Sequence, residues 1–274
     1  MKKVLTIAGS DSCGGAGVQA DLKSFSANGV YGMSVITAIT AQNTMGVFAV
    51  QDLDKEIIVA QIDAIFTDIT VDAVKIGMVS VISTIDAISE KLQQYKPKNI
   101  VLDPVMISKS GYSLLKPESK TELINKLIPL ASLITPNVPE AEEILREVHS
   151  AITSIETVED MERAAKEIYK LGCKSVLLKG GHMEGDAIDV FYDGKEITQF
   201  KSERILTKNT HGTGCTLSSA IAANLALGFS MKDAIKNSKE YITTAIKHSL
   251  DIGHGVGPTN HFYELYKKAG IGND

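Results

Sequence analysis

The sequence has little of what marks several specialised classes of protein. Its three cysteines in 274 residues are widely spaced and include no Cys-x-x-Cys pair, so neither a disulfide framework nor a zinc site is expected. Seven prolines and the lack of a low-complexity tract argue against disorder. This cysteine usage favours a reducing compartment, and we expect a cytoplasmic protein.

Basic residues are outnumbered, with 28 Lys and Arg against 33 Asp and Glu and a formal net charge of -5. Nucleic acids and anionic membranes bind clustered basic residues, so neither is an expected partner. No apolar run approaches the ~18 residues that a membrane helix needs. The run that follows Lys3 is also too short for the core of a signal peptide.

Several common catalytic motifs are missing too. There is no Gly-x-x-x-x-Gly-Lys-Ser/Thr, which excludes a P-loop enzyme, and neither a Gly-x-Ser-x-Gly nor a His-Glu-x-x-His, so a hydrolase or metalloprotease has no support. The turn Gly9–Gly17 lacks a strict Gly-x-Gly-x-x-Gly, and the acidic residue expected about 20 residues later is absent. A dinucleotide-binding oxidoreductase is therefore disfavoured.

What the sequence does contain is a regular alternation of two patterns. Short β-branched runs alternate with longer stretches that carry apolar residues at helical spacing. Strands are predicted at Val4–Ala8, Ser34–Thr40, Ala73–Ile76, Asn99–Leu102, Leu133–Thr135 and Ser175–Leu178. Helices are predicted at about Gly17–Asn28, Lys55–Thr67, Ile82–Tyr95, Glu118–Ile128, Glu140–Arg146, Val158–Leu171, Gly214–Leu227 and Met231–Ser249.

This alternation predicts one α/β domain over residues 1–274, with a mainly parallel central sheet and helices on both faces. The pair Asp193-Gly194 is typical of a two-residue hairpin turn, so Ile188–Tyr192 and Glu196–Phe200 should form antiparallel edge strands. Polar or glycine-rich segments follow the predicted strands at Gly9–Gly17, Gln42-Asn43, Gly77-Met78, Asp103–Gly111, Asn137–Glu140 and Lys179–His182. Ligands of such folds bind at the carboxyl ends of the strands, where these segments should meet.

The segment Thr210–Thr216 is a candidate phosphate site. Gly212, Thr213 and Gly214 open an apolar helix, whose first N–H groups and positive dipole end suit an anion. Cys215 would lie in the first turn, where we expect its thiol pKa to fall, so that it can take a proton from a substrate hydroxyl. A plain glycine-rich helix start with a small buried cysteine fits the local pattern equally well.

Asn137 and Glu140 could orient water around a nucleotide-bound Mg²⁺, but they also have the spacing of a helix capping box. Asp103 is a second carboxylate for that region or a turn residue before a proline. Lys109 and Lys179 are possible phosphate partners or members of solvated loops. Asp21 lies in the first predicted helix, where it is either a ligand-binding acid or an exposed acid near the helix cap.

Taken together, these segments resemble the ribokinase-like superfamily and, within it, the hydroxymethylpyrimidine/phosphomethylpyrimidine kinases of thiamine biosynthesis. The segments similar to the motifs of that family are Ala8–Lys23, Thr40–Thr44, Lys75–Met78, Asp103–Met106, Thr135–Asn137, Lys179–His182, Asn209–Thr216 and His254–Pro258. They run in order along nearly the whole chain, and several are long.

The resemblance implies ATP and Mg²⁺ as cofactors. It also implies phosphorylation of 4-amino-5-hydroxymethyl-2-methylpyrimidine and then of its monophosphate. It places Gln42 and Asp21 against the pyrimidine ring, with Gly9, Ala16, Met78 and Val105 lining the pocket. It further assigns an anion hole to Gly212–Gly214 and magnesium to Asn137, Glu140 and Asp103. Thr210, which opens the candidate phosphate segment, is expected to contact phosphate as well.

The resemblance also implies a homodimer and makes Cys215 the base, where most of the wider superfamily has Asp. A related branch acts as pyridoxal kinase and carries an additional cysteine in the flap after Met106. That flap reads Ile107–Gly111 here, without a cysteine, which disfavours the branch. A nucleotide-binding regulator without turnover is a further alternative. The presence of Cys215 counts against it, since a sensor has no need of the base. Cys13 stands where relatives often have Ser.

Overall fold

The computed structural model describes residues 1–107, 114–181 and 186–271. Lys109 and His182 therefore lie outside the described residues. The described part contains a nine-stranded sheet with strand order β3-β2-β1-β4-β5-β6-β7-β8-β9. The strands are β1 Lys3–Asp11, β2 Tyr31–Asn43, β3 Gly46–Asp52, β4 Ala73–Ile76, β5 Ile100–Leu102, β6 Leu133–Ile134, β7 Val176–Leu178, β8 Ala187–Tyr192 and β9 Ile197–Ser202.

The six central strands, from β2 to β7, pair in parallel. Strand β3 is antiparallel at one edge, and β8 and β9 are antiparallel at the other. The expectation of a mainly parallel α/β sheet with antiparallel edge strands is therefore confirmed. Because the parallel strands all point the same way, the loops that follow them gather along one edge of the sheet.

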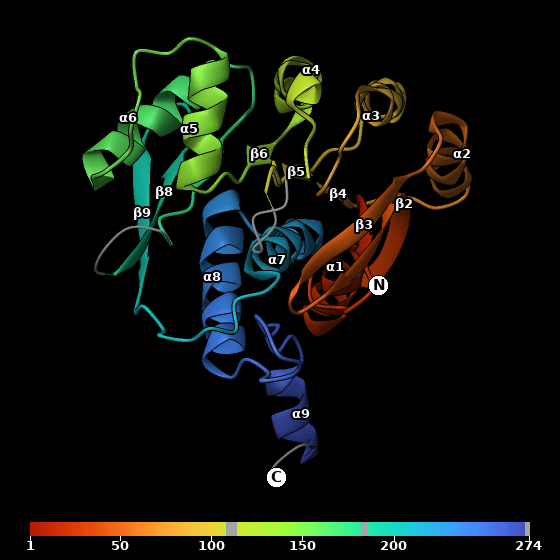
Figure 1. The fold of residues 1–274 in the computed structure, drawn as a ribbon, viewed down its shortest axis with the longest axis vertical. Coiled ribbons are helices and arrows are strands. Elements are labelled where there is room, and N and C mark those ends of the chain that lie inside the picture. The colour runs from red at the N-terminus through yellow and green to blue at the C-terminus, as the bar shows by residue number, and fades with distance from the viewer. Residues whose placement is uncertain (108–113, 182–185, 272–274) are drawn as a thin grey trace.

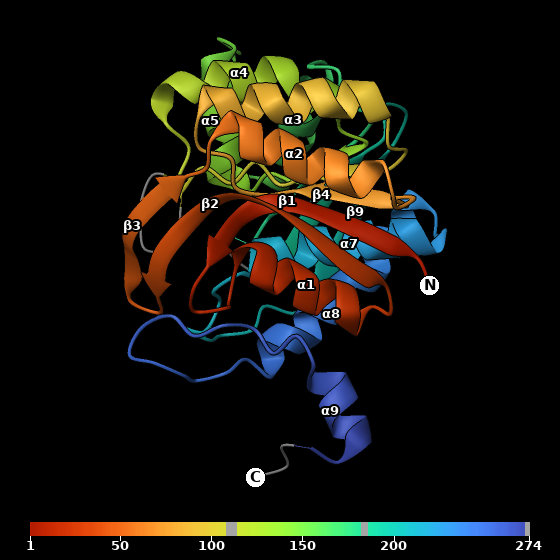
Figure 2. The same ribbon diagram turned by 90° about the vertical axis from the view of Figure 1, so that its right-hand side faces the viewer.

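Helices cover both faces of this sheet (Figures 1 and 2). The helices are α1 Gly17–Ala27, α2 Lys55–Phe66, α3 Ile82–Tyr95, α4 Lys120–Lys126, α5 Val138–Glu147, α6 Val158–Tyr169, α7 Thr213–Leu227, α8 Met231–Lys247 and α9 Tyr263–Ala269. Helices α2 to α6 pack on one face around a large apolar core, and α1, α7 and α8 pack on the other around a second core.

Helix α7 is the most enclosed of these helices, with every residue from Thr216 to Ala226 buried. Its alanines at positions 220, 222, 223 and 226 are small enough for close packing. It contacts α1, α8 and strands β1, β4 and β5. A helix that is apolar on all sides is expected to be buried in this way. Its N-terminus is therefore held firmly at the edge where the strand-end loops gather.

Several predicted elements differ from the observed ones. Strand β3 and helix α9 were not predicted, because neither contains a buried residue and both lack a clear apolar period. The stretch predicted as a helix at Glu118–Ile128 divides into α4 and two flanking 3-10 turns that contain Pro117 and Pro129. Proline lacks an N–H, so Pro129 cannot continue the regular helix, while Pro117 is tolerated in the first turn.

The predicted two-residue hairpin turn is wrong. Tyr192 pairs with Ile197, which leaves a four-residue loop. The Asp193 carboxylate accepts hydrogen bonds from the backbone N–H groups of Lys195 and Glu196, each at 2.9 Å, and this closes the longer turn. Among the described residues, no helix is long and apolar enough to cross a membrane.

Candidate active site

Two glycine-rich segments meet at the carboxyl edge of the sheet, although they lie about 200 positions apart. One is the turn after β1, and the other precedes α7. Gly212 has a φ of 78°, and a β-carbon there would overlap the carbonyl oxygen of Gly15. A β-carbon at Gly15 would in turn overlap the ring of His211. Glycine is required here because the two backbones touch.

The Asp11 carboxylate joins these two segments. It accepts hydrogen bonds from the backbone N–H groups of Cys13 (2.9 Å), Gly15 (3.0 Å) and Ala16 (2.8 Å). The Nε2 atom of His211 lies 2.8 Å from its Oδ2 atom. Burial by itself would raise the pKa of the Asp11 carboxyl, but His211 and the N–H groups hold the pKa below its usual value. Sequence reasoning missed this role, although Asp11 lies within a motif it had identified.

Cys215 lies in the first turn of α7, as expected, but the expected fall in its pKa is wrong. Burial raises the pKa of the thiol to about 11. The positive charge of Lys75 acts in the opposite direction, while Asp21 and Asp103 raise the pKa further. Desolvation and two carboxylates therefore outweigh the favourable position at a helix N-terminus.

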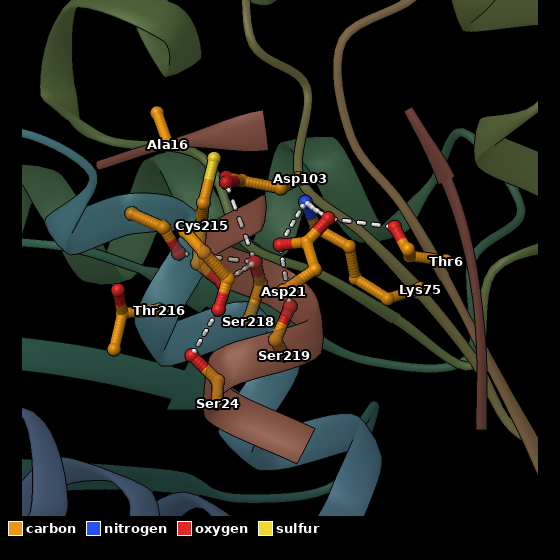
Figure 3. A network of polar contacts seen from close by, with 12 residues as sticks. Thr6, Ala16, Asp21, Ser24, Lys75, Asp103, Cys215, Thr216, Ser218 and Ser219 are labelled. Carbon is orange, nitrogen blue, oxygen red and sulfur yellow. Dashed lines mark hydrogen bonds and ion pairs between the residues drawn. The ribbon is translucent and has the colours of Figure 1, made fainter. Parts of the chain in front are cut away.

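A buried ion pair lies beside Cys215 and the start of α7 (Figure 3). The Lys75 ammonium is 2.9 Å from each carboxylate oxygen of Asp21, and both side chains have no exposure. The hydroxyls of Thr6 and Ser219 also donate to Asp21, at 2.6 and 2.7 Å. Burial disfavours the charged form of Lys75, but Asp21, Cys215 and Asp103 raise its pKa overall.

This geometry corrects the role that the resemblance assigned to Asp21. Both carboxylate oxygens have buried partners and neither is exposed, so the side chain cannot face a pyrimidine ring. The alternative of an exposed acid near the helix cap is also wrong, for the same reason. Lys75 lies within one of the family-like motifs, and the signal for its role is a charged residue in a strand that is otherwise apolar and buried.

A second ion pair lies on the other side of Gly214. The Lys179 ammonium is 2.9 Å from Oδ1 of Asp103, and both side chains are largely buried. The hydroxyls of Thr135 and Ser218 donate to the same carboxylate, at 3.2 and 3.4 Å. A β-carbon at Gly214 would lie 3.4 Å from both Asp103 and Lys179. The anion hole predicted at Gly212–Gly214 therefore borders one buried cation and one buried carboxylate directly.

Asn137 and Glu140 form the capping box of α5. Glu140 donates its N–H to Oδ1 of Asn137, and the N–H of Asn137 donates to Oε2 of Glu140, both at 2.9 Å. Burial raises the pKa of Glu140 to about 7; Lys179 opposes this rise and Asp103 adds to it. A carboxyl whose pKa is raised by burial and by a second acid is suited to gain a cation. The capping role is thus observed, and the backbone N–H of Met106 also hydrogen-bonds the Glu140 carboxylate.

The remaining predicted residues lie around the same edge. A β-carbon at Gly9 would lie 3.0 Å from the sulfur of Met78, which is buried. Ala16 and Val105 are partly exposed. The Gln42 Nε2 atom lies 3.3 Å from His211 Nε2, which joins this amide to the segment that precedes α7. Thr213 donates its N–H to the carbonyl of Thr210 at 3.4 Å.

Comparison with known proteins gives a consistent result. The sequence model of the family described as phosphomethylpyrimidine kinase matches residues 11–260. The hydroxymethylpyrimidine/phosphomethylpyrimidine kinase of Rhizobium meliloti is 51% identical over 266 residues, which cover 96% of this chain and 98% of that protein.

Two solved structures are also similar. The crystal structure of phosphomethylpyrimidine kinase from Clostridium difficile is 58% identical, with a TM-score of 0.80 over 90% of this chain and 100% of that one. Bacillus subtilis pyridoxal kinase, solved as an ADP complex, is 42% identical, with a TM-score of 0.88 over 97% of this chain and 99% of that one. The chain therefore belongs to the phosphomethylpyrimidine kinase family, within the ribokinase-like fold.

Proposed function

We propose that this chain uses ATP to phosphorylate the 5-hydroxymethyl group of 4-amino-5-hydroxymethyl-2-methylpyrimidine, and then phosphorylates the monophosphate to the diphosphate. Family membership supports a kinase. The observation that carries the site is the position of Cys215, in the first turn of a buried helix and between two ion pairs. That place brings together a proton acceptor, the backbone N–H groups of a helix start and fixed charge.

The γ-phosphoryl group would lie at the start of α7. The N–H groups of Gly212, Thr213 and Gly214 and the dipole of a 15-residue helix favour a negative group there. Lys179 adds a positive charge next to Gly214. Because phosphoryl transfer needs mainly positioning and charge neutralisation, these groups can stabilise the charge that builds on the transferred phosphoryl.

Cys215 would act as the base in the first transfer. With its own proton already lost to solvent, the Sγ thiolate takes the proton of the substrate hydroxyl while that oxygen forms a bond to the γ-phosphorus. The bond from phosphorus to the bridging oxygen of ATP breaks at the same time, and ADP leaves with that electron pair. The thiol then returns its proton to solvent. Because the pKa of this thiol is raised, only the thiolate fraction of the enzyme can accept the proton, and that fraction limits the rate of the first transfer.

Mg²⁺ fits the acidic side of this site. Asp103 and Glu140 are buried carboxyls on neighbouring elements, and oxygen ligands of this kind suit a magnesium ion that keeps several waters. Asp103 and Glu140 would hold it, and Asn137 would keep Glu140 oriented through the capping box. When bound, the ion neutralises phosphate charge. The raised pKa of Glu140 supports this, because a cation there would favour the ionised form.

The pyrimidine would lie against the turn after β1. Gln42 can donate and accept at once, which matches the edge of an aminopyrimidine. Its amide is placed by His211, and it lies near the end of β2. Gly9, Ala16, Met78 and Val105 would line the pocket around the ring. Lys109 and Thr210 remain proposed phosphate contacts, the former in a segment outside the described residues.

Pyridoxal kinase is the second candidate, because the Bacillus subtilis enzyme of that name superimposes with a TM-score of 0.88. One assay separates the two. The purified chain is incubated with Mg-ATP and, in turn, with hydroxymethylpyrimidine, its monophosphate and pyridoxal, and ADP formation is followed. We expect turnover of both pyrimidines. Turnover of pyridoxal alone would reject the leading assignment.

A cytoplasmic location and a homodimer complete the proposal. All three cysteines are free, which fits a reducing compartment. Two apolar side chains are exposed at the edge strand β3: Met45 (59%), which directly precedes the strand, and Phe48 (67%), which lies in it. A second copy of the chain could cover them. Analytical ultracentrifugation tests the dimer, and a monomer at micromolar concentration would reject it.

A further inference from the structure

The ion pair between Lys75 and Asp21 is too deeply buried to bind a ligand. Both side chains are fully excluded from solvent, and no substrate atom can reach them. A buried ion pair is also a weak source of stability, because removing two charges from water offsets most of their attraction. A role in stability alone therefore explains poorly why a charged pair, and not an apolar one, fills this space.

The surroundings of the pair show that the position of the ammonium is specific. A β-carbon at Gly77 would lie 2.5 Å from the Lys75 nitrogen and 3.0 Å from the β-carbon of Ala8. The absence of a side chain at Gly77 thus leaves the space that the ammonium occupies. Asp21 holds the nitrogen symmetrically, and Thr6 and Ser219 fix the carboxylate.

The charged groups around Cys215 come from four elements. Lys75 on β4 favours the thiolate, while Asp21 on α1 and Asp103 after β5 oppose it. Lys179, after β7, also interacts with the thiolate favourably. Of Lys75, Asp21 and Asp103, Lys75 has the largest effect on the pKa of the Cys215 thiol. Figure 3 shows Lys75, Asp21 and Cys215 close together at the start of α7.

We propose that Lys75 is a positioning group for Cys215: its ammonium, fixed by Asp21, supplies the positive charge that stabilises the Cys215 thiolate. Asp21 keeps this charge in place and prevents its loss by deprotonation. No atom of either residue needs to contact the substrate. The inference deepens the proposed function, since it rests on Cys215 being the group that accepts the proton.

The test compares three variants: Lys75→Met, Asp21→Asn, and the double variant. The double variant leaves no unpaired buried charge, so it guards against misfolding of either single variant. In Asp21→Asn, the hydroxyls of Thr6 and Ser219 can turn to accept from the new amide. The matched control is the double variant Lys239→Met with Asp189→Asn. It removes another buried pair, whose nitrogen and oxygen are 2.6 Å apart, and Asn keeps an acceptor for the N–H of Gly180.

The first measurement needs no substrate. At pH 8.5 the thiol of Cys215 is largely protonated, so its rate of alkylation by iodoacetamide follows the thiolate fraction. Mass spectrometry of the Cys215 peptide reports that rate. We expect ~10-fold slower alkylation in Lys75→Met, about threefold slower in the double variant, and faster alkylation in Asp21→Asn. The control pair should leave it unchanged, and Cys13 serves as an internal reference in each sample.

The second measurement is steady-state kinetics with hydroxymethylpyrimidine. Lys75→Met should lower kcat and leave both KM values within about twofold, because the side chain cannot reach either ligand. Equal Cys215 alkylation in the wild type, Lys75→Met and the double variant would overturn the inference, even if kcat fell. If the wild type phosphorylates no pyrimidine, the proposed function fails, while the alkylation series still decides the role of Lys75.

Discussion

The Nε2 atom of His211 lies 2.8 Å from Oδ2 of Asp11, and this contact joins the turn after the first strand to the segment that opens α7. The same carboxylate accepts three backbone N–H groups of its own turn. The turn after β1 and the proposed anion hole are therefore joined directly, although they come from opposite ends of the chain. Substitutions in either segment should affect both.

Gly212→Ala should be strongly destabilising, because the new methyl group would meet the carbonyl of Gly15 in addition to the strain of a positive φ. We expect a loss of unfolding free energy greater than the roughly 1–2 kcal/mol that the left-handed conformation alone adds. Urea unfolding measures it. Gly228→Ala is the matched control, since Gly228 has a φ of 98° with no atom within 4 Å of a β-carbon. Similar losses in the two variants would contradict the backbone contact.

Cys215→Ala should separate the two phosphoryl transfers. A hydroxyl must lose its proton to be phosphorylated, whereas a phosphate monoester with a second pKa near 6 is already ionised at pH 8. We expect kcat for hydroxymethylpyrimidine to fall about 100-fold and kcat for the monophosphate to fall less, with pyrimidine binding retained. Cys173→Ala, which removes a buried thiol that packs in the core of the opposite face, should leave both kcat values intact. Near-normal turnover of the alcohol would remove Cys215 from the role of base.

The pH dependence follows from the same thiol. Because burial raises the pKa of Cys215 to about 11, the thiolate fraction of the free enzyme grows with pH throughout the neutral range. The kcat/KM for hydroxymethylpyrimidine should therefore rise, by up to about tenfold per pH unit between pH 8 and 9.5. Cys215→Asp replaces the thiol with a group ionised across this window, so its profile there should be flat. A flat profile in the wild type would argue against a thiolate base.

Gln42→Ala should act on binding and not on chemistry. Loss of a paired donor and acceptor at a ring edge corresponds to about 1–3 kcal/mol, or roughly 10- to 100-fold in Kd for the pyrimidine. Isothermal titration with hydroxymethylpyrimidine measures it. Gln51→Ala, an exposed glutamine on neighbouring β3, is the control. An unchanged Kd in Gln42→Ala would refute its assignment to the ring.

Glu140→Gln should make the protein more stable at alkaline pH and less active. Burial raises the pKa of Glu140 from 4.5 to about 7, so the folded protein holds a proton that the unfolded chain releases between these values. The bound proton stabilises the folded state relative to the unfolded chain, and this stabilisation is lost as the pH rises through 7. Gln keeps the capping box but carries no charge. We expect a gain of about 3 kcal/mol at pH 8 and less than about 1 kcal/mol at pH 5.

Urea unfolding at the two pH values tests this difference. Glu159→Gln, an exposed acid in the first turn of α6, is the control and should show no gain that depends on pH. A constant effect of Glu140→Gln at both pH values would show that Glu140 titrates normally. Loss of Mg-ATP turnover in the same variant, with its fold intact, would support the magnesium role.

The sequence predicted the strand-end loops and their convergence, because short apolar runs and helical spacing are local signals. Several elements have the bounds that the pattern indicated, for example the strand Ala73–Ile76 and the helix Ile82–Tyr95. The electrostatics of the site could not be predicted in this way. The pKa of Cys215 depends on burial and on carboxylates at positions 21 and 103, and no local pattern carries that information.

Asp21 illustrates the same limit. Its sequence neighbourhood resembles a ligand-binding motif, yet its partners Lys75 and Ser219 lie 54 and 198 positions away, and together they seal it from solvent. A motif identifies a residue that matters and leaves open whether it contacts the ligand or supports a residue that does. Only the packing of α1 against α7 distinguishes these two roles.

The contact between the two glycine-rich segments has a consequence for synthesis of the protein. The turn after β1 leaves the ribosome early, but its shape is completed by His211 and Gly212, which are translated much later. A nascent chain that has already formed β1 through β7 still lacks α7 and with it Cys215. Premature termination anywhere in the first three quarters of the message therefore releases a fragment that lacks the segment where we propose that phosphoryl transfer takes place.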